Sequence, residues 1–310
     1  MHTTGWHEVV GVDGPFVSVY LDVSDHLDLR WRAVRDQLDG AGADPALLAV
    51  VESAVRATLP APGRSPRAGR GLVAAGDRVL VDRYLPVPPP GYTARFGPLP
   101  YLLPLVDLSE PLLPHVVVQV DEHGAELRGV DPSGRPVAVA SVGARRPGRP
   151  WGAAELADVA QEATTLVDRL SAPLLVLAGP LPTRRSLRVA LPDRYHHLVV
   201  EVEGSPDRAV LHLAGRANQD RRRAVAQRFR DESAGLTGRA VHGLAAVREA
   251  LANEAVETLL LTDALVGARS VDGGRADEVL PLLAAACGAD IALVGGAVQL
   301  REDVGALLAA

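Results

Sequence analysis

The sequence predicts a mixed α/β protein (α+β, multidomain), because short β-branched segments alternate with amphipathic helical segments along the chain. At 310 residues the chain is long enough for two or three domains with buried cores. Hydrophobic residues make up 47% and charged residues 23%, which is the balance of a folded globular protein. We therefore expect three domains, at residues 1–112, 113–206 and 207–310.

The first segment has the pattern of a small α/β unit. Asp44 followed by Pro45 predicts a helix start, since aspartate caps helix N-termini and proline fits the first helical turn. Gly76 and Asp77 lie between two apolar runs and predict the turn of a β-hairpin. The expected strands are 16–23, 72–75, 79–84 and 102–108, and the expected helices are 27–38 and 45–59.

The second segment predicts a three-stranded meander followed by a helix and further strands. Residues 121–124 and 131–134 are the two turn sequences of the meander. Apolar residues then recur at helical spacing from Leu156 to Leu170, with Glu155 near the start and Arg169 near the end, as the helix dipole favours. The expected strands are 116–120, 125–130, 137–142, 174–177 and 198–202, and a short helix is expected at 184–191.

The third segment alternates helix and strand, which predicts a sheet with helices packed on both faces, an α/β/α sandwich. The expected helices are 218–233, 244–251, 276–287 and 303–309, and the expected strands are 258–261 and 291–294.

The segment Gly143–Pro150 is a basic loop in an acidic protein. It holds Arg145, Arg146 and Arg149 and no acidic residue, although the net charge of the chain is -6. A proline-stiffened loop between a strand and a helix can present its charge to a polyanion. Because arginine binds two phosphate oxygens with one planar fork, contact with RNA or phosphate is one interpretation, and solubility alone is the other.

Other arginine clusters differ in their neighbours. One lies in a loop without acids and admits the same two interpretations as Gly143–Pro150: Arg64, Arg67 and Arg70. A second lies on the short helix expected at 184–191: Arg184, Arg185 and Arg188. A third is interleaved with Asp220, Asp231 and Glu232, which indicates a solvated and partly self-paired helix face: Arg221, Arg222, Arg223, Arg228 and Arg230.

Several classes of function lack their sequence signals. The single cysteine, Cys287, cannot form a disulfide framework or a multi-cysteine zinc site within one chain, and we expect it to be a packed small hydrophobe. The nine histidines show no metal-site spacing, and no nucleotide-binding or serine-hydrolase motif is present. We expect neither metal nor cofactor. No apolar run reaches membrane-spanning length and no signal-peptide pattern begins the chain, so we expect a cytoplasmic protein.

The order of these parts resembles the peptide-chain release factors of archaea and eukaryotes. Residues 114–130 (PHVVVQVDEHGAELRGV), the loop, the helix and then LLVLAGP are similar to the middle domain of that superfamily. Residues 243–263 (GLAAVREALANEAVETLLLTD) are similar to the start of its C-terminal domain, and FVSVYLDV looks like the N-terminus of its bacterial branch. That branch includes relatives of Vms1-type peptidyl-tRNA hydrolases and of the hibernation factor Balon. The resemblance implies three domains in release-factor-like order.

The chain departs from that family at the catalytic tip. Release factors of the family carry Gly-Gly-Gln in the loop before the long helix, where the glutamine positions a water against the ester of peptidyl-tRNA. This chain has no such tripeptide, and the first glutamine after its loop is Gln161. The resemblance therefore implies a ribosome-associated protein without peptidyl-tRNA hydrolysis, which occupies the A site in hibernation or stress response.

The same resemblance implies the partners. They are ribosomal RNA at the A site and a translational GTPase, without DNA or a membrane, and the expected RNA-binding residues are Arg145, Arg146, Arg149, Arg64, Arg67 and Arg70. Two alternatives remain open at this point. One is an active peptidyl-tRNA hydrolase with a non-standard tip, and the other is an α/β protein that binds a small molecule.

Overall fold

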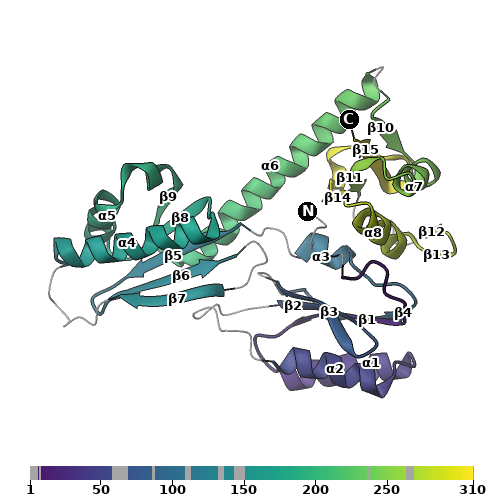
Figure 1. Ribbon diagram of the computed structural model, residues 1–310, viewed down its shortest axis with the longest axis horizontal. Coiled ribbons are helices and arrows are strands. Elements are labelled where there is room, and N and C mark those ends of the chain that lie inside the picture. Colours follow the sequence, from purple (N-terminus) through teal and green to yellow (C-terminus); the bar gives the residue numbers. More distant parts are fainter. Residues whose placement is uncertain are drawn as a thin grey trace. The chain divides into compact units, whose positions relative to one another are not determined.

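A computed structural model of the chain describes residues 6, 8–57, 69–85, 88–108, 113–131, 136–142, 151–235, 238–262 and 269–309. The chain forms two compact units. Unit 1 comprises residues 1–57, 67–110 and 217–310, and unit 2 comprises residues 58–66 and 111–216. The fold is mixed α/β, as predicted, with several sheets covered by helices (Figure 1). Among the described residues, no helix is both long and apolar enough to cross a bilayer.

The N-terminal part of unit 1 is an antiparallel sheet in the order β3-β2-β1-β4. Its elements are β1 (Phe16–Asp22), α1 (Leu27–Gly40), α2 (Pro45–Arg56), β2 (Gly69–Ala75), β3 (Arg78–Leu85), β4 (Thr93–Gly97) and α3 (Leu103–Leu108). Alternate residues of β1 divide between the two faces, so that Val17, Val19 and Leu21 pack beneath α1 and α2. Figure 1 shows these two helices together on that face.

The predicted start of α2 is confirmed at atomic detail. The Asp44 carboxylate accepts a hydrogen bond from the Ala46 backbone N–H at 2.8 Å, and Pro45 is the first helical residue. The side chain thus satisfies a donor that the helix start would otherwise leave without a partner.

The C-terminal part of unit 1 is a mixed sheet in the order β10-β15-β11-β14, in which only the β11–β14 pair is parallel. Its elements are β10 (Ala240–His242), α7 (Leu244–Ala252), β11 (Val256–Leu261), β12 (Ser270–Val271), β13 (Gly274–Arg275), α8 (Ala276–Ala286), β14 (Asp290–Leu293) and β15 (Val304–Leu308). Residues of α6 (Pro206–Ala234), with Ala226 and Phe229 foremost, cover one face. Helices α7 and α8 contribute to the core on the other face.

One hydrophobic core serves both sheets of unit 1. It includes Phe16 and Tyr20 from β1 together with Leu259, Leu261 and Leu280 from the C-terminal part. The first and last predicted segments therefore share their interior, which the order of elements along the chain did not indicate.

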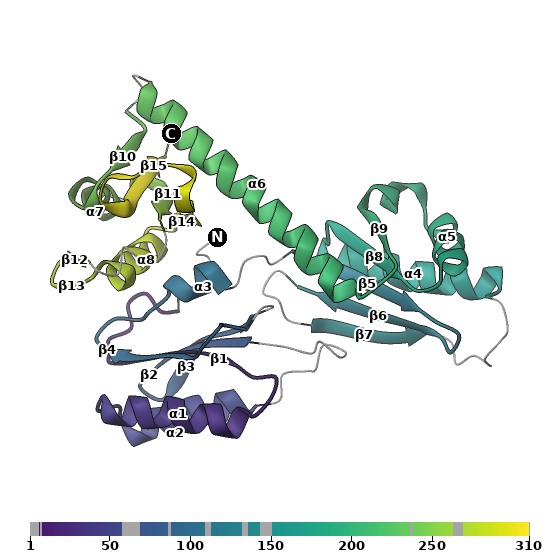
Figure 2. The ribbon, with the colours of Figure 1, turned by 180° about the vertical axis from the view of Figure 1, so that it is seen from behind.

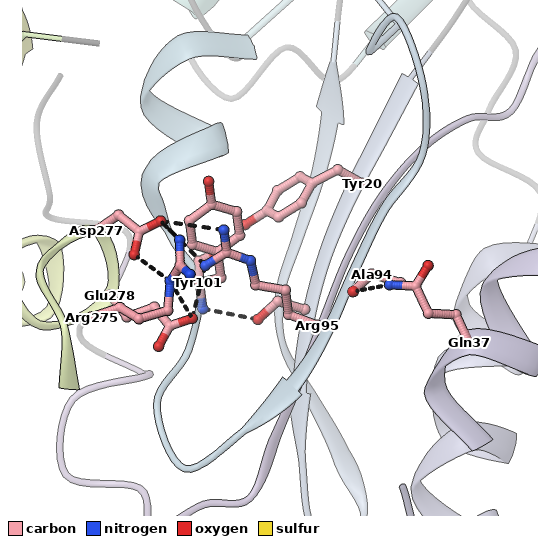
Figure 3. A network of polar contacts seen from close by, with 9 residues as sticks. Tyr20, Gln37, Ala94, Arg95, Tyr101, Arg275, Asp277 and Glu278 are labelled. Carbon is pink, nitrogen blue, oxygen red and sulfur yellow. Dashed lines mark hydrogen bonds and ion pairs between the residues drawn. The ribbon is translucent and has the colours of Figure 1, made fainter. Parts of the chain in front are cut away.

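A polar network joins the same two parts of unit 1 (Figure 3). Asp277 in the first turn of α8 is buried, and its Oδ2 accepts from Nη2 of Arg95 on β4 at 3.2 Å and from Nη2 of Arg275 at 3.0 Å. The Arg95 guanidinium also donates to Glu278 at 2.8 Å and lies 3.3 Å above the ring centre of Tyr101. The Tyr20 hydroxyl donates to the carbonyl of Tyr101. Burial raises the pKa of both Tyr20 and Tyr101.

Unit 2 is built on a five-stranded sheet in the order β7-β6-β5-β8-β9. The elements are β5 (His115–Val120), β6 (Ala125–Val130), β7 (Pro136–Val142), α4 (Ala153–Leu170), β8 (Leu174–Ala178), α5 (Leu181–Ala190), a 3₁₀ segment (Asp193–Leu198) and β9 (Val199–Val202). The meander β5–β6–β7 is antiparallel, whereas β8 and β9 continue from β5 in parallel. Helix α4 packs on one face (Figure 2). The first turns of α6 contribute Val210 to the core on the other face.

Two predicted elements have the wrong type. Residues 102–108 were expected to be a strand, but residues 103–108 form the short helix α3. Leu102, Leu103, Leu105 and Val106 are buried in the core of unit 1. Residues 303–309 were expected to be a helix, but β15 lies between β10 and β11. Its Gly305 has no room for a side chain, since a Cβ there would lie 3.0 Å from the ring of Phe229. Tertiary pairing thus overrides a weak local pattern.

The predicted start of the charged helix is also too late. Helix α6 begins at Pro206, twelve residues before the expected Asn218, and runs unbroken to Ala234. Strands β4 and β10 were not predicted, because each is short and carries no clear alternation.

We predict that Asp277→Ala lowers the free energy of unfolding by about 1–3 kcal/mol, because Arg95 and Arg275 lose their hydrogen bonds to a buried carboxylate. Urea unfolding followed by circular dichroism measures the change. Asp272→Ala is the matched control, since its pair with Arg248 at 2.9 Å is half exposed and should cost at most about 1 kcal/mol. Equal losses in the two variants would contradict a special role for Asp277.

Candidate RNA-facing site

The predicted site lies on the segment Gly143–Pro150, and Arg145, Arg146 and Arg149 fall outside the described residues. The two ends of this segment are described. Val142 ends β7 and pairs with Ala125 of β6. On the far side of the segment, the Trp151 indole donates from Nε1 to the carbonyl oxygen of Asp121 at 3.2 Å, and its ring packs against the core under α4. Both ends are thus held beside the turn between β5 and β6.

Helix α4 begins immediately after this segment with a strong cap. The Glu155 carboxylate accepts from the backbone N–H of Gly152 at 2.8 Å, and the Leu156 N–H donates to the Gly152 carbonyl at 3.1 Å. The carboxylate also favours the positive end of the helix dipole. The start of α4, immediately after the arginine segment in sequence, is therefore held in place.

The turn beside these ends is polar and acidic. Asp121 Oδ1 accepts from the backbone N–H groups of His123 at 2.7 Å and Gly124 at 3.0 Å, which closes the turn. An open hollow next to it is lined by Gln119, Asp121, His123, Gly124, Ala125, Glu126 and Ser141. Carboxylates at this position repel phosphate, so the turn itself is unsuited to an RNA contact.

The second predicted basic loop gives a correction. Arg64 and Arg67 fall outside the described residues, but Arg70 is described and is buried, with 3% of its surface exposed. It donates from Nε and Nη2 to the two carboxylate oxygens of Asp82 at 2.8 and 2.6 Å. It also donates to the carbonyl of Ala57 at 3.1 Å. Arg70 therefore closes the end of α2 onto the sheet, and its guanidinium is not available to RNA.

The other arginine clusters are partly internal. Arg184 on α5 is buried, and its closest described carboxylate oxygen, on Glu203, is 3.8 Å away. On α6, Arg228 forms a bidentate ion pair with Glu257 of β11, in which Nη2 donates to Oε2 at 2.6 Å. This pairing lowers the pKa of Glu257. Arg223 lies 3.5 Å from Asp220. The predicted self-pairing within α6 is therefore real at Arg223, while Arg228 pairs with a different element.

Sequence reasoning missed a buried polar cluster on the face of the unit 2 sheet that α6 covers. Arg128 of β6 donates from Nη2 to Asp207 of α6 at 3.1 Å. His115 at the start of β5 donates from Nδ1 to the carbonyl of Leu113 at 2.7 Å, which fixes its neutral tautomer. Burial lowers the pKa of His115, although the Asp207 charge opposes this effect. Alternation along β6 placed Arg128 on this face, but its partner lies 79 residues away in sequence.

A second polar hollow lies at the opposite end of α4. The Tyr195 hydroxyl donates to Asp168 Oδ2 at 2.7 Å and accepts from Arg194 Nη2 at 2.6 Å, beside Ser171 and His197. The hydrogen bond to Asp168 raises the pKa of Tyr195. These contacts tie the 3₁₀ segment to the end of α4, which is a structural role.

His196 and Cys287 each contact a backbone carbonyl of their own segment. His196 contacts the carbonyl of Leu191 at 2.9 Å, and the Sγ of Cys287 lies 3.5 Å from the carbonyl of Ala284 at the end of α8. In the part of the chain that the structure describes, no three His, Cys, Asp or Glu side chains gather into a group that could hold a metal ion.

The chain is similar both to a family model and to a full-length relative. Residues 151–235 match the model of bacterial archaeo-eukaryotic release factor family 2. The uncharacterized protein Rv2629 of Mycobacterium tuberculosis (strain ATCC 25618 / H37Rv) is 32% identical over 358 residues, which cover 97% of this chain and 94% of that protein.

Solved structures to which this chain shows some similarity include two of Pelota. Ribosome-bound archaeal Pelota, from a model with ABCE1, has a TM-score of 0.44 and 18% identity, and the match covers 79% of this chain and 77% of that one. Archaeoglobus fulgidus Pelota has a TM-score of 0.41 and 16% identity, with coverage of 96% and 98%.

We predict that Arg70→Met lowers the free energy of unfolding by about 2–3 kcal/mol, because hydrogen bonds to a charged partner and to the end of α2 are lost together. The same variant should bind RNA as the unchanged chain does, since Arg70 is buried. Differential scanning calorimetry and an RNA filter-binding assay measure the two effects. Weakened RNA binding with unchanged stability would refute the structural role of Arg70.

We predict a pH dependence of stability that comes from His115. Burial holds the pKa of His115 in the folded state below the unfolded value of about 6.5. At a pH between these two pKa values, His115 binds a proton in the unfolded chain but not in the folded chain. Stability should be complete above about pH 6.5 and should fall as the pH drops toward the folded pKa. In His115→Gln the slope between about pH 7 and pH 5 should flatten, whereas the exposed control His123→Gln should keep it. An unchanged slope in His115→Gln would contradict this assignment.

Proposed function

We propose that this chain, which belongs to the bacterial archaeo-eukaryotic release factor family, binds the ribosome without hydrolysing peptidyl-tRNA and occupies the A site in hibernation or stress response. The observation that carries the proposal is the segment between β7 and α4. It holds Arg145, Arg146 and Arg149 and no glutamine, at the position where the family resemblance places a catalytic tip.

The chemistry of this segment supports binding. Three guanidinium groups can contact phosphates in pairs of hydrogen bonds and can stack on bases, and both interactions suit ribosomal RNA or the acceptor end of tRNA. Attack on the ester of peptidyl-tRNA requires a group that orients a water molecule. An arginine, which keeps its proton in proteins, cannot act as the general base for that water. The segment is therefore suited to hold RNA.

The described contacts at the base of the segment support the same function. The pairing of Val142 with Ala125 holds the chain before the segment, and the Trp151 hydrogen bond to Asp121 and the Glu155 cap hold the chain after it. The flanking chain therefore need not be ordered when the arginines bind. We assign contact with a protein partner, a translational GTPase, to the C-terminal sheet of unit 1.

The proposal predicts that the protein co-sediments with ribosomes in a salt-dependent manner. Replacing Arg145, Arg146 and Arg149 together by Glu should weaken this association by roughly tenfold or more, because three phosphate contacts become repulsive. The matched control carries the same charge change at three exposed arginines of unit 1, Arg32→Glu, Arg78→Glu and Arg301→Glu, and should bind nearly as the unchanged chain does.

A peptide-release assay on ribosomes that carry peptidyl-tRNA separates binding from hydrolysis. We expect no release of peptide by the unchanged chain, and cryo-imaging of ribosomes from stationary-phase cells should place it in the A site. Release of peptide that is lost when the segment is replaced would establish the hydrolase alternative. Co-sedimentation with ribosomes that changes neither with salt concentration nor with the triple Glu substitution would overturn the proposal.

A further inference from the structure

A row of basic and amide side chains follows one exposed face of α6. The basic row consists of Arg208, His212, Arg216, Gln219 and Arg223. Successive members are three or four residues apart, which places them one above another on the same side of a helix. Because all five belong to one helix, this common face follows from the helical period alone.

Burial along α6 shows that the basic row faces away from the protein interior. All five members are exposed, whereas Val210, Ala214, Ala226 and Phe229 of the same helix are buried in the sheet cores. The apolar side of α6 is thus used for folding. The basic row is left to solvent over about 22 Å, from fifteen residues at 1.5 Å each.

The charges of α6 are unevenly shared around the helix. Asp207 is engaged by Arg128 of β6 at 3.1 Å, and Asp231 accepts from Gln227 at 2.8 Å. Asp220 lies beside the basic row, 3.5 Å from Arg223, but both side chains are about three-quarters exposed, at 75% and 73%. Such an exposed pair is worth at most about 1 kcal/mol, so a phosphate can displace it. The row is therefore a strip of net positive charge in a chain of net charge -6.

We propose that the basic row of α6 binds the phosphate backbone of RNA. Members four residues apart rise by about 6 Å along the helix, so neighbouring side chains can reach successive phosphates of one strand. Arginine supplies paired donors for each phosphate, and His212 and Gln219 supply further hydrogen bonds between them.

The composition of the row favours RNA over other acidic partners. A membrane-surface helix needs large exposed apolar residues beside its basic face, but Val210 and Phe229 of α6 are buried. The other large apolar residues of the helix, Leu211, Leu213 and Val225, are half-buried. A docking site for an acidic protein needs an apolar or aromatic centre, and the row has none among its five members. Backbone phosphates require only donors and charge.

The inference rests on the proposed function, since a protein that works at the ribosome meets RNA there, but its site is separate from Gly143–Pro150. The test uses the full chain and a short duplex RNA of mixed sequence. Arg208→Gln, Arg216→Gln and Arg223→Gln together should weaken binding by roughly tenfold, and the slope of log affinity against log salt should fall by about 2–3. The matched control, Arg32→Gln, Arg78→Gln and Arg301→Gln, should change neither quantity.

A second variant tests whether the planar guanidinium groups matter beyond their charge, and it shows whether a loss of binding comes from misfolding. The same three positions changed to Lys keep their charge, so the salt slope should stay while the affinity falls less than in the Gln variant. Circular dichroism should show the same helix content in all variants, because the side chains are exposed. Equal losses in the α6 variant and the control would overturn the inference, as would undetectable binding by the unchanged chain. A poly-glutamate peptide that binds with the same dependence on the row would also overturn it in favour of an acidic protein.

The outcome for the proposed function is read separately. If the α6 variant loses duplex binding and still co-sediments with ribosomes, the basic row binds RNA and the loop arginines carry ribosome association. If the unchanged chain binds duplex RNA through the row and does not co-sediment, the proposed function fails and the inference stands.

Discussion

The arrangement of unit 1 depends on one buried carboxylate. Asp277 is 2% exposed, and a buried charge is tolerated only when it is paired and hydrogen-bonded. Its partners come from opposite ends of the chain, Arg95 on β4 and Arg275 beside α8. Two segments that are separated in sequence by residues 111–216 of unit 2 therefore meet at this network, with Tyr101 stacked beneath Arg95. Hydrophobic burial drives their association, and this network sets where they meet.

Arginine serves two different purposes in this protein, and its surroundings decide which one applies. Arg70 and Arg128 are buried and hold elements together through Asp82 and Asp207. Arg208 and Arg216 are exposed, with their charge directed to solvent. Because every basic residue of the chain other than histidine is arginine, composition alone cannot separate these roles. Burial separates them, since a guanidinium enclosed by the protein and paired with a carboxylate cannot be reached by a phosphate in solution.

The proposed function follows from the contrast between a rigid base and a basic tip. Val142, paired with Ala125, ends the strand before the arginine segment, and Trp151 and Glu155 hold the chain that follows it. The acidic turn at Asp121 discourages phosphate at the base. Because both flanks of the segment are already held, RNA binding by its arginines would not have to order the flanking chain, which supports the proposed binding role.

The sequence by itself determined the elements whose signal is local. The cap at Asp44, the meander from β5 to β7 and the apolar stripe of α4 were all predicted and are present, because capping and periodicity act over a few residues. For the candidate site it supplied the arginine segment and its position between β7 and α4. Only the tertiary structure decided that residues 304–308 form a strand and that Arg70 is internal. Both outcomes depend on partners distant in sequence: β15 is held between β10 and β11, and Arg70 by Asp82 across a strand pair. A local pattern carries no information about such contacts.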